Sequence, residues 1–145
     1  MKAIILILAT IFANSCEEQL KDMETTAIEY TANTRGYYQQ ITVRDQIATI
    51  SRDRDGVAKP EVIKISDSDW KALVAAFSKV NLEQIPALKA PSEKRAFDGA
   101  AIANLKIRHK DKIYESTAFD HGNPPAEIKE LVDKIVQFGK QKDGN

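Results

Sequence analysis

Two carboxylates and an imidazole come close together at the predicted open end of a hairpin in the second half of the sequence. Asp120 and His121 follow one predicted strand directly, and Asp98 precedes the other. Carboxylate oxygens and imidazole nitrogens bind divalent metals, and the same groups move protons in general acid/base catalysis. These residue types therefore indicate a metal site or an acid/base site at one rim of a sheet.

The hairpin that would position these side chains turns at Lys110 and Asp111. Apolar and polar residues alternate over 101–108, and residues 113–119 form the returning strand. Residues equally far from the turn oppose each other, so we expect Phe119 to face Ile102. Extending this register brings the two aspartates and the histidine together beyond the strand ends.

Further charged and polar residues surround the three within the sequence. A loop that begins at Pro91 lacks apolar periodicity and carries both cations and a carboxylate, and a polar residue follows the histidine. We therefore take residues 93–98 and 120–123 as the candidate contact surface. Its candidate binding residues are Glu93, Lys94, Arg95, Asp98, Asp120, His121 and Asn123.

A structural interpretation of the same residues competes with the functional one, and we favour it. Asp98 and Asp120 would accept hydrogen bonds from loop amides, as aspartates beside glycine do, and His121 would be a donor near the last helix. The sequence contains no Gly-x-Ser-x-Gly, no His-Glu-x-x-His and no phosphate-binding loop. We assign no catalytic residue, no metal and no cofactor.

The hydrophobic pattern predicts a single α+β domain over residues 27–139. Residues 28–32, 37–43, 47–51 and 62–65 read as consecutive strands with short connections, which is typical of an antiparallel meander. A helix capped by Ser66 follows, with an apolar face that runs from Trp70 to Val80. After the hairpin, a last helix should begin with Asn123 as its cap and Pro124 in its first turn. The order is β-β-β-β-α-β-β-α, with both helices on one face of the sheet.

The first fifteen residues read as a signal peptide. Lys2 is their only charge, and an eleven-residue run from Ala3 to Ala13 follows it, interrupted by a single hydroxyl. A membrane-spanning helix needs about 20 apolar residues, so this run is too short to span.

Ala13, Asn14 and Ser15 lead directly into Cys16, which is the only cysteine. This arrangement resembles bacterial lipoprotein signals, and the resemblance implies cleavage before Cys16, acylation of that residue and attachment to the membrane. The alternative is ordinary secretion, with cleavage near Ala13 and a free thiol at Cys16. In that family, an aspartate directly after the cysteine is linked to retention in the inner membrane. The chain has Glu17 at this position, so the resemblance implies the outer membrane. The acidic pair of Glu17 and Glu18 also resembles export tags of surface lipoproteins.

Residues 16–26 read as the lipidated cysteine and a polar tether, with a short amphipathic helix as the alternative, and residues 140–145 read as a frayed tail. Equal numbers of cationic and anionic side chains, 21 of each, exclude the electrostatic footprint of a nucleic-acid-binding protein. Gly36, Tyr37 and Tyr38 resemble an aromatic-glycine opening found in small envelope lipoproteins, and the order of elements is similar to emfourin-type inhibitors of metalloproteases.

We therefore expect a non-enzymatic binding domain in the cell envelope with an envelope protein as its partner. One alternative is a small metal-binding protein or hydrolase that uses Asp98, Asp120 and His121. Another is an inhibitor of a secreted protease.

Replacement of Cys16 by alanine tests the predicted anchor. Two or three acyl chains hold a protein on a membrane permanently, because each buried methylene contributes about 0.8 kcal/mol. We expect Cys16→Ala to move the protein from the membrane fraction to the soluble fraction. Cell fractionation and immunoblotting measure the distribution. Continued membrane association of the variant would contradict acylation at this residue.

Overall fold

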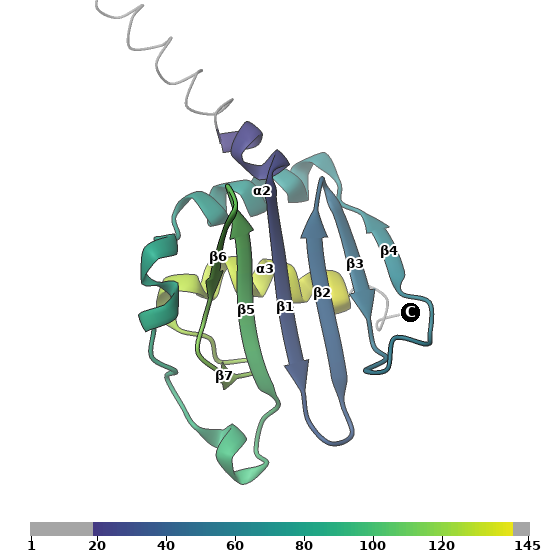
Figure 1. Cartoon of the computed structure of the whole chain (residues 1–145), viewed down its shortest axis with the longest axis vertical. Coiled ribbons are helices and arrows are strands. Elements are labelled where there is room, and N and C mark those ends of the chain that lie inside the picture. The colour runs from purple at the N-terminus through teal and green to yellow at the C-terminus, as the bar shows by residue number, and fades with distance from the viewer. Residues whose placement is uncertain (1–18, 141–145) are drawn as a thin grey trace, which may run out of the picture.

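The structure is a computed structural model that describes residues 19–140, so the predicted signal peptide, Cys16 and the tail after Lys140 lie outside the described residues. The chain forms an antiparallel sheet packed against helices (Figure 1). The strands are β1 (Thr26–Asn33), β2 (Tyr38–Arg44), β3 (Ile47–Ser51), β4 (Glu61–Lys64), β5 (Ile102–His109), β6 (Lys112–Glu115) and β7 (Phe119–Asp120). The helices are α2 (Asp67–Ser78) and α3 (Lys129–Lys140), with short 3-10 turns η1 (Leu82–Ala87), η2 (Lys94–Phe97) and η3 (Ala126–Ile128).

The sheet has the order β4-β3-β2-β1-β5-β6, with β7 paired to β5. Strands β1 to β4 form the predicted meander, and β5 returns on the other side of β1 after α2. Strand β1 is therefore central, and its Tyr30 is opposite Ile41 on one side and Leu105 on the other. The predicted α+β class and antiparallel meander are confirmed.

One face of the sheet forms the core. The alternating residues Ile28, Tyr30 and Ala32 of β1 are fully buried, and the residues between them are partly exposed. Both long helices cover this face, as Figure 1 shows. Their buried residues include Leu73 of α2 and Ile135 of α3. Buried residues recur every second position in the strands and at helical spacing in the helices, because both kinds of element bury one side at the interface between the sheet and the helices.

The two helices begin differently from each other. The Ser66 hydroxyl accepts a hydrogen bond from the Asp69 amide at 3.1 Å, so the predicted cap of α2 is confirmed. The predicted start of the last helix is wrong, because Asn123 instead bridges to Asp120 and α3 begins only at Lys129. Pro124 directly precedes Pro125, and the ring of a proline disfavours the helical conformation of the residue before it.

The segment before β1 belongs to the folded domain. Residues 19–24 are helical, and the Met23 side chain is 1% exposed in the core. The interpretation of this part as a polar tether is therefore wrong, and the alternative of a short helix applies. Leu20 and Met23 are the only large apolar residues of this short segment, which is too few to establish a helical period from the sequence. Within residues 19–140, no helix has the length and apolar character needed to cross a membrane.

The register of the hairpin changes by one residue along its length. Near the turn, Ile107 is opposite Tyr114, as counting from Lys110 and Asp111 predicts. Farther on, Phe119 is opposite Ala103 and not Ile102, so that part of the prediction is wrong. Between the two paired stretches the Ser116 hydroxyl accepts from the Leu105 amide at 3.0 Å.

The physical reason for the shift is burial of an aromatic ring. Opposed residues share a face of a sheet, and Ile102 lies on the exposed face, where it is 44% exposed. One extra residue before β7 places Phe119 on the core face beside Ala103, where the ring is fully buried. The ring centroid of Phe119 lies 6.2 Å from that of Tyr30.

We expect the shifted register to appear in paired alanine substitutions. Phe119→Ala should lower the free energy of unfolding by about 3–5 kcal/mol, because it empties a fully buried aromatic site. Ile102→Ala, the matched control on the exposed face, should change it by less than about 1 kcal/mol. Urea unfolding followed by circular dichroism measures both values, and equal losses would show that the two side chains share one environment.

Candidate functional site

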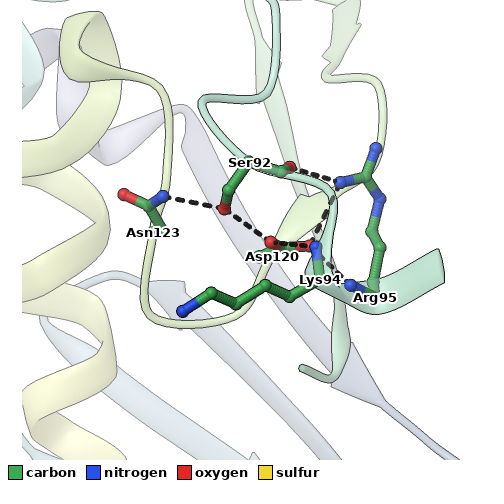
Figure 2. Close-up of polar contacts among 5 residues, drawn as sticks. All are labelled: Ser92, Lys94, Arg95, Asp120 and Asn123. Carbon is green, nitrogen blue, oxygen red and sulfur yellow. Dashed lines mark hydrogen bonds and ion pairs between the residues drawn. The ribbon is translucent and has the colours of Figure 1, made fainter. Parts of the chain in front are cut away.

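The carboxylate of Asp120 is the centre of the polar network at the end of the hairpin (Figure 2). One oxygen, Oδ2, accepts from the Ser92 hydroxyl at 2.5 Å and from the Lys94 amide at 2.8 Å. The other, Oδ1, accepts from the Arg95 amide at 3.0 Å and from Arg95 Nη1 at 3.1 Å. Four donors therefore surround a side chain that is 2% exposed.

Secondary contacts tie the same donors together. Arg95 Nη1 also donates to the Ser92 backbone carbonyl at 2.8 Å. The side-chain amide of Asn123 donates from Nδ2 to the Ser92 hydroxyl at 2.8 Å. Asp98, at the end of η2, has a φ of 58°, a left-handed conformation that aspartate tolerates well. The loop between η1 and β5, which contains η2, is thus pinned to the segment that links β7 to α3.

Opposing effects act on the pKa of Asp120. Burial alone would raise it, because an ion loses solvation in the protein interior. Hydrogen bonds from Ser92, from the Arg95 and Lys94 amides and from the Arg95 guanidinium favour the ionised form and hold the pKa well below its usual range. A carboxylate has about four lone-pair sites, and all four are used here. The ionised group therefore has no capacity left to bind a metal or take up a proton near neutral pH.

His121 makes a separate pair with Tyr30 of β1. The Tyr30 hydroxyl and His121 Nδ1 are 2.7 Å apart and share one hydrogen bond. Burial, with a smaller contribution from the Lys140 charge, lowers the pKa of His121. Burial is also the main cause that raises the pKa of Tyr30, and electrostatic repulsion from Tyr37 and Asp133 raises it further. Both groups are therefore neutral near pH 7.

The Tyr30–His121 pair borders a cavity of about 330 Å³ beside α3. Asp133, Gln137 and Lys140 of that helix line the cavity with the pair. A neutral histidine could act as a base, but its Nδ1 is already engaged by the tyrosine. Across residues 19–140, no three histidine, cysteine, aspartate or glutamate side chains are grouped so that they could hold a metal ion.

The structure brings only part of the predicted site together. Asp120, Arg95 and Asn123 belong to one network, and Lys94 contributes its amide while its side chain runs away from the carboxylate (Figure 2). Among residues 19–140, no hydrogen bond joins the side chains of Asp98, Asp120 and His121 to one another: His121 shares a hydrogen bond with Tyr30, and Asp98 is exposed. Glu93 is also exposed and begins η2 without a capping hydrogen bond from its side chain.

The structural interpretation of Asp120 as an acceptor for loop amides is confirmed, and that of Asp98 is not. In the described part of the chain, the Asp98 carboxylate accepts no hydrogen bond. The sequence interpretation missed Ser92 and Tyr30. Ser92 follows Pro91 in a polar loop, and Tyr30 fits the core pattern of β1, so neither position carries a local signal of its partner.

Comparisons of the chain with protein-family models, with curated proteins and with solved structures found no match.

We expect Asp120→Asn to loosen the loop that contains η2. The amide keeps the shape but loses the charge and one acceptor, so hydrogen exchange at the Lys94 and Arg95 amides should become at least about tenfold faster. The matched control, Asp98→Asn, changes a carboxylate without a hydrogen-bonded donor and should leave both rates unchanged.

The acid dependence of the same variant follows from the lowered pKa. Asp120 stabilises the fold above the ordinary aspartate pKa of about 3.9, and this contribution is lost as pH falls from there toward the folded-state value. The melting temperature of Asp120→Asn should therefore lie below that of the unsubstituted protein at pH 7, and the difference should shrink below about pH 4. A difference that stays constant from pH 7 to pH 2.5 would contradict the assignment.

Proposed function

We propose that the protein is a membrane-anchored envelope lipoprotein of the outer membrane, and that its α+β domain is a non-enzymatic module that binds an envelope protein. The support for the anchor is the pattern of residues 1–16, with its short apolar run that ends at Cys16. The support for binding is a pinned, apolar-tipped loop at one end of the sheet.

That end of the sheet is opposite the end at which the described part of the chain begins (Figure 1). Strand β1 starts at Thr26, ten residues after Cys16, and runs to Asn33 at the other end. Eight residues of strand extend about 26 Å. The loops at the far end, residues 34–37, 52–59 and 91–101, are named the distal surface, and Figure 1 shows them opposite the N-terminal helix.

The distal surface carries the two most exposed large apolar side chains among residues 19–140. Val57 is 88% exposed and Phe97 is 86% exposed, and Tyr37 on the neighbouring turn is 40% exposed. Aromatic side chains and arginine are enriched in the centres of protein interfaces, where they account for most of the binding energy. Phe97 and Arg95 lie in the same 3-10 turn, η2.

The network around Asp120 gives this loop a defined shape before binding. Three residues of the loop bind the carboxylate by four hydrogen bonds, and Phe97 follows the last of them, Arg95, by two residues. A loop that is already ordered loses less conformational entropy when it contacts a partner. The apolar tip on a pinned loop is the observation that carries the proposal.

The alternative of a hydrolase or metal-binding protein is less well supported. All the lone pairs of Asp120 are engaged by loop donors, and Asp98 and His121 do not join it. Inhibition of a secreted protease would use the same distal surface and is a particular case of protein binding. Residual peptidase activity of secreted proteases in the presence of the protein tests that case.

We expect Val57→Ala combined with Phe97→Ala to reduce recovery of the cross-linked partner from cell envelopes at least about tenfold, because both changes remove apolar contact area. Ile113→Ala is the matched control, since Ile113 is 54% exposed on β6, near the end of the sheet where β1 begins. Quantitative mass spectrometry of cross-linked complexes measures the recovery. Equal recovery by all three proteins would remove the distal surface from consideration.

A further inference from the structure

Three arginines converge on one cavity at the distal end of the molecule. The cavity has a volume of about 300 Å³ and lies between the turn after β1, the loop after β3 and the loop before β5. Its lining includes Arg35, Arg54 and Arg95, each from a different one of these loops, with Asp98 as the single carboxylate of the lining. Arg95 is paired with the Asp120 carboxylate, so Arg35 and Arg54 are the two cations of the lining that can balance the charge of a bound anion, against the single carboxylate of Asp98.

Arg54 is held in place by backbone and ring contacts, and within residues 19–140 it forms no ion pair. Its guanidinium donates to the backbone carbonyls of Thr34 and Tyr37 and lies 5.9 Å from the centre of the Tyr38 ring. Carbonyl and ring contacts orient the positive charge but do not cancel it. Arg54 therefore presents a positioned cation to the cavity.

The other two arginines keep donors available. Arg95 uses Nη1 for Asp120 and for the Ser92 carbonyl, and its side chain is 20% exposed. In the described part of the chain, its remaining guanidinium nitrogens donate no hydrogen bond. Arg35 is exposed on the turn after β1, and among residues 19–140 it forms no ion pair.

We propose that this cavity is an oxyanion site that binds a carboxylate or phosphate group. A guanidinium is planar and offers parallel N–H donors that match two oxygens of such a group, and it remains charged at every physiological pH. The volume is at the lower end of the range for small-molecule sites, which fits a compact anion. The group could belong to a free small molecule or to an acidic side chain of a partner.

The cavity lies within the distal surface, but its binding of an anion requires neither the lipid anchor nor a protein partner and is tested independently of the proposed function. Asp98 allows a second test of the proposal, because its negative charge repels an anion that enters the cavity. Removing that charge should strengthen binding, whereas removing an arginine should weaken it. Opposite effects from two residues of one cavity are not produced by general destabilisation of the fold.

The test is isothermal titration of the full chain in nonionic detergent at low ionic strength. The probes are citrate, inorganic phosphate and a hexaglutamate peptide, with chloride as the reference anion. We expect at least one probe to bind, Arg35→Gln and Arg54→Gln each to weaken it about tenfold, and Asp98→Asn to tighten it. Arg44→Gln is the matched control, because Arg44 ends β2 at the other end of the sheet.

The outcomes are distinct. Absence of binding by all three probes, or equal affinities for the unsubstituted protein and Arg35→Gln, would overturn the oxyanion site. Binding of citrate or phosphate but not of the peptide identifies a free small anion, and tighter binding of the peptide identifies acidic side chains of a partner. Anion binding that persists in Val57→Ala combined with Phe97→Ala separates this site from the protein-binding proposal, which stands or falls on partner recovery.

Discussion

A buried, ionised carboxylate at Asp120 is the constraint on which the distal end of this domain depends. An ion removed from water is tolerated only when charged or polar donors replace the lost solvation. Here the donors are the Ser92 hydroxyl, two backbone amides and a guanidinium, all from one loop. Satisfying the carboxylate therefore determines the path of residues 92–95, and with it the positions of the arginine and phenylalanine side chains that the loop presents.

The three successive residues that end the hairpin contact two parts of the fold, the central strand β1 and the loop that contains η2. Phe119 packs in the core against Tyr30, Asp120 binds the loop that contains η2, and His121 shares a hydrogen bond with the Tyr30 hydroxyl. The short strand β7 and the residue after it thereby connect the central strand β1, the loop that contains η2 and the segment that leads to α3. The change of register before β7 is what allows this, because counting from the turn would place Phe119 on the exposed face.

Local patterns predicted the elements well and their connections less well. Alternation in β1 and the Ser66 cap of α2 are properties of neighbouring residues, and both were predicted correctly. The one-residue shift before Phe119 was missed because counting from a turn assumes uninterrupted pairing. The start of the last helix was missed because two adjacent prolines disfavour helix at the first of them, against the preference of Asn123 for a cap.

The sequence by itself determined the α+β class and the antiparallel meander, because each follows from residues close together in the chain. It also indicated Asp120 as an acceptor for loop amides, but the donors lie 25 to 28 residues away in the chain and only the tertiary structure identified them. Only the tertiary structure showed that His121 shares its hydrogen bond with Tyr30 and not with Asp120, and only it brought Arg35, Arg54 and Arg95 to one cavity. Periodicity reports how one segment is buried, whereas the meeting of three loops depends on strand order and register across the whole sheet. That long-range geometry is set by burial of the shared core, and no single segment contains it.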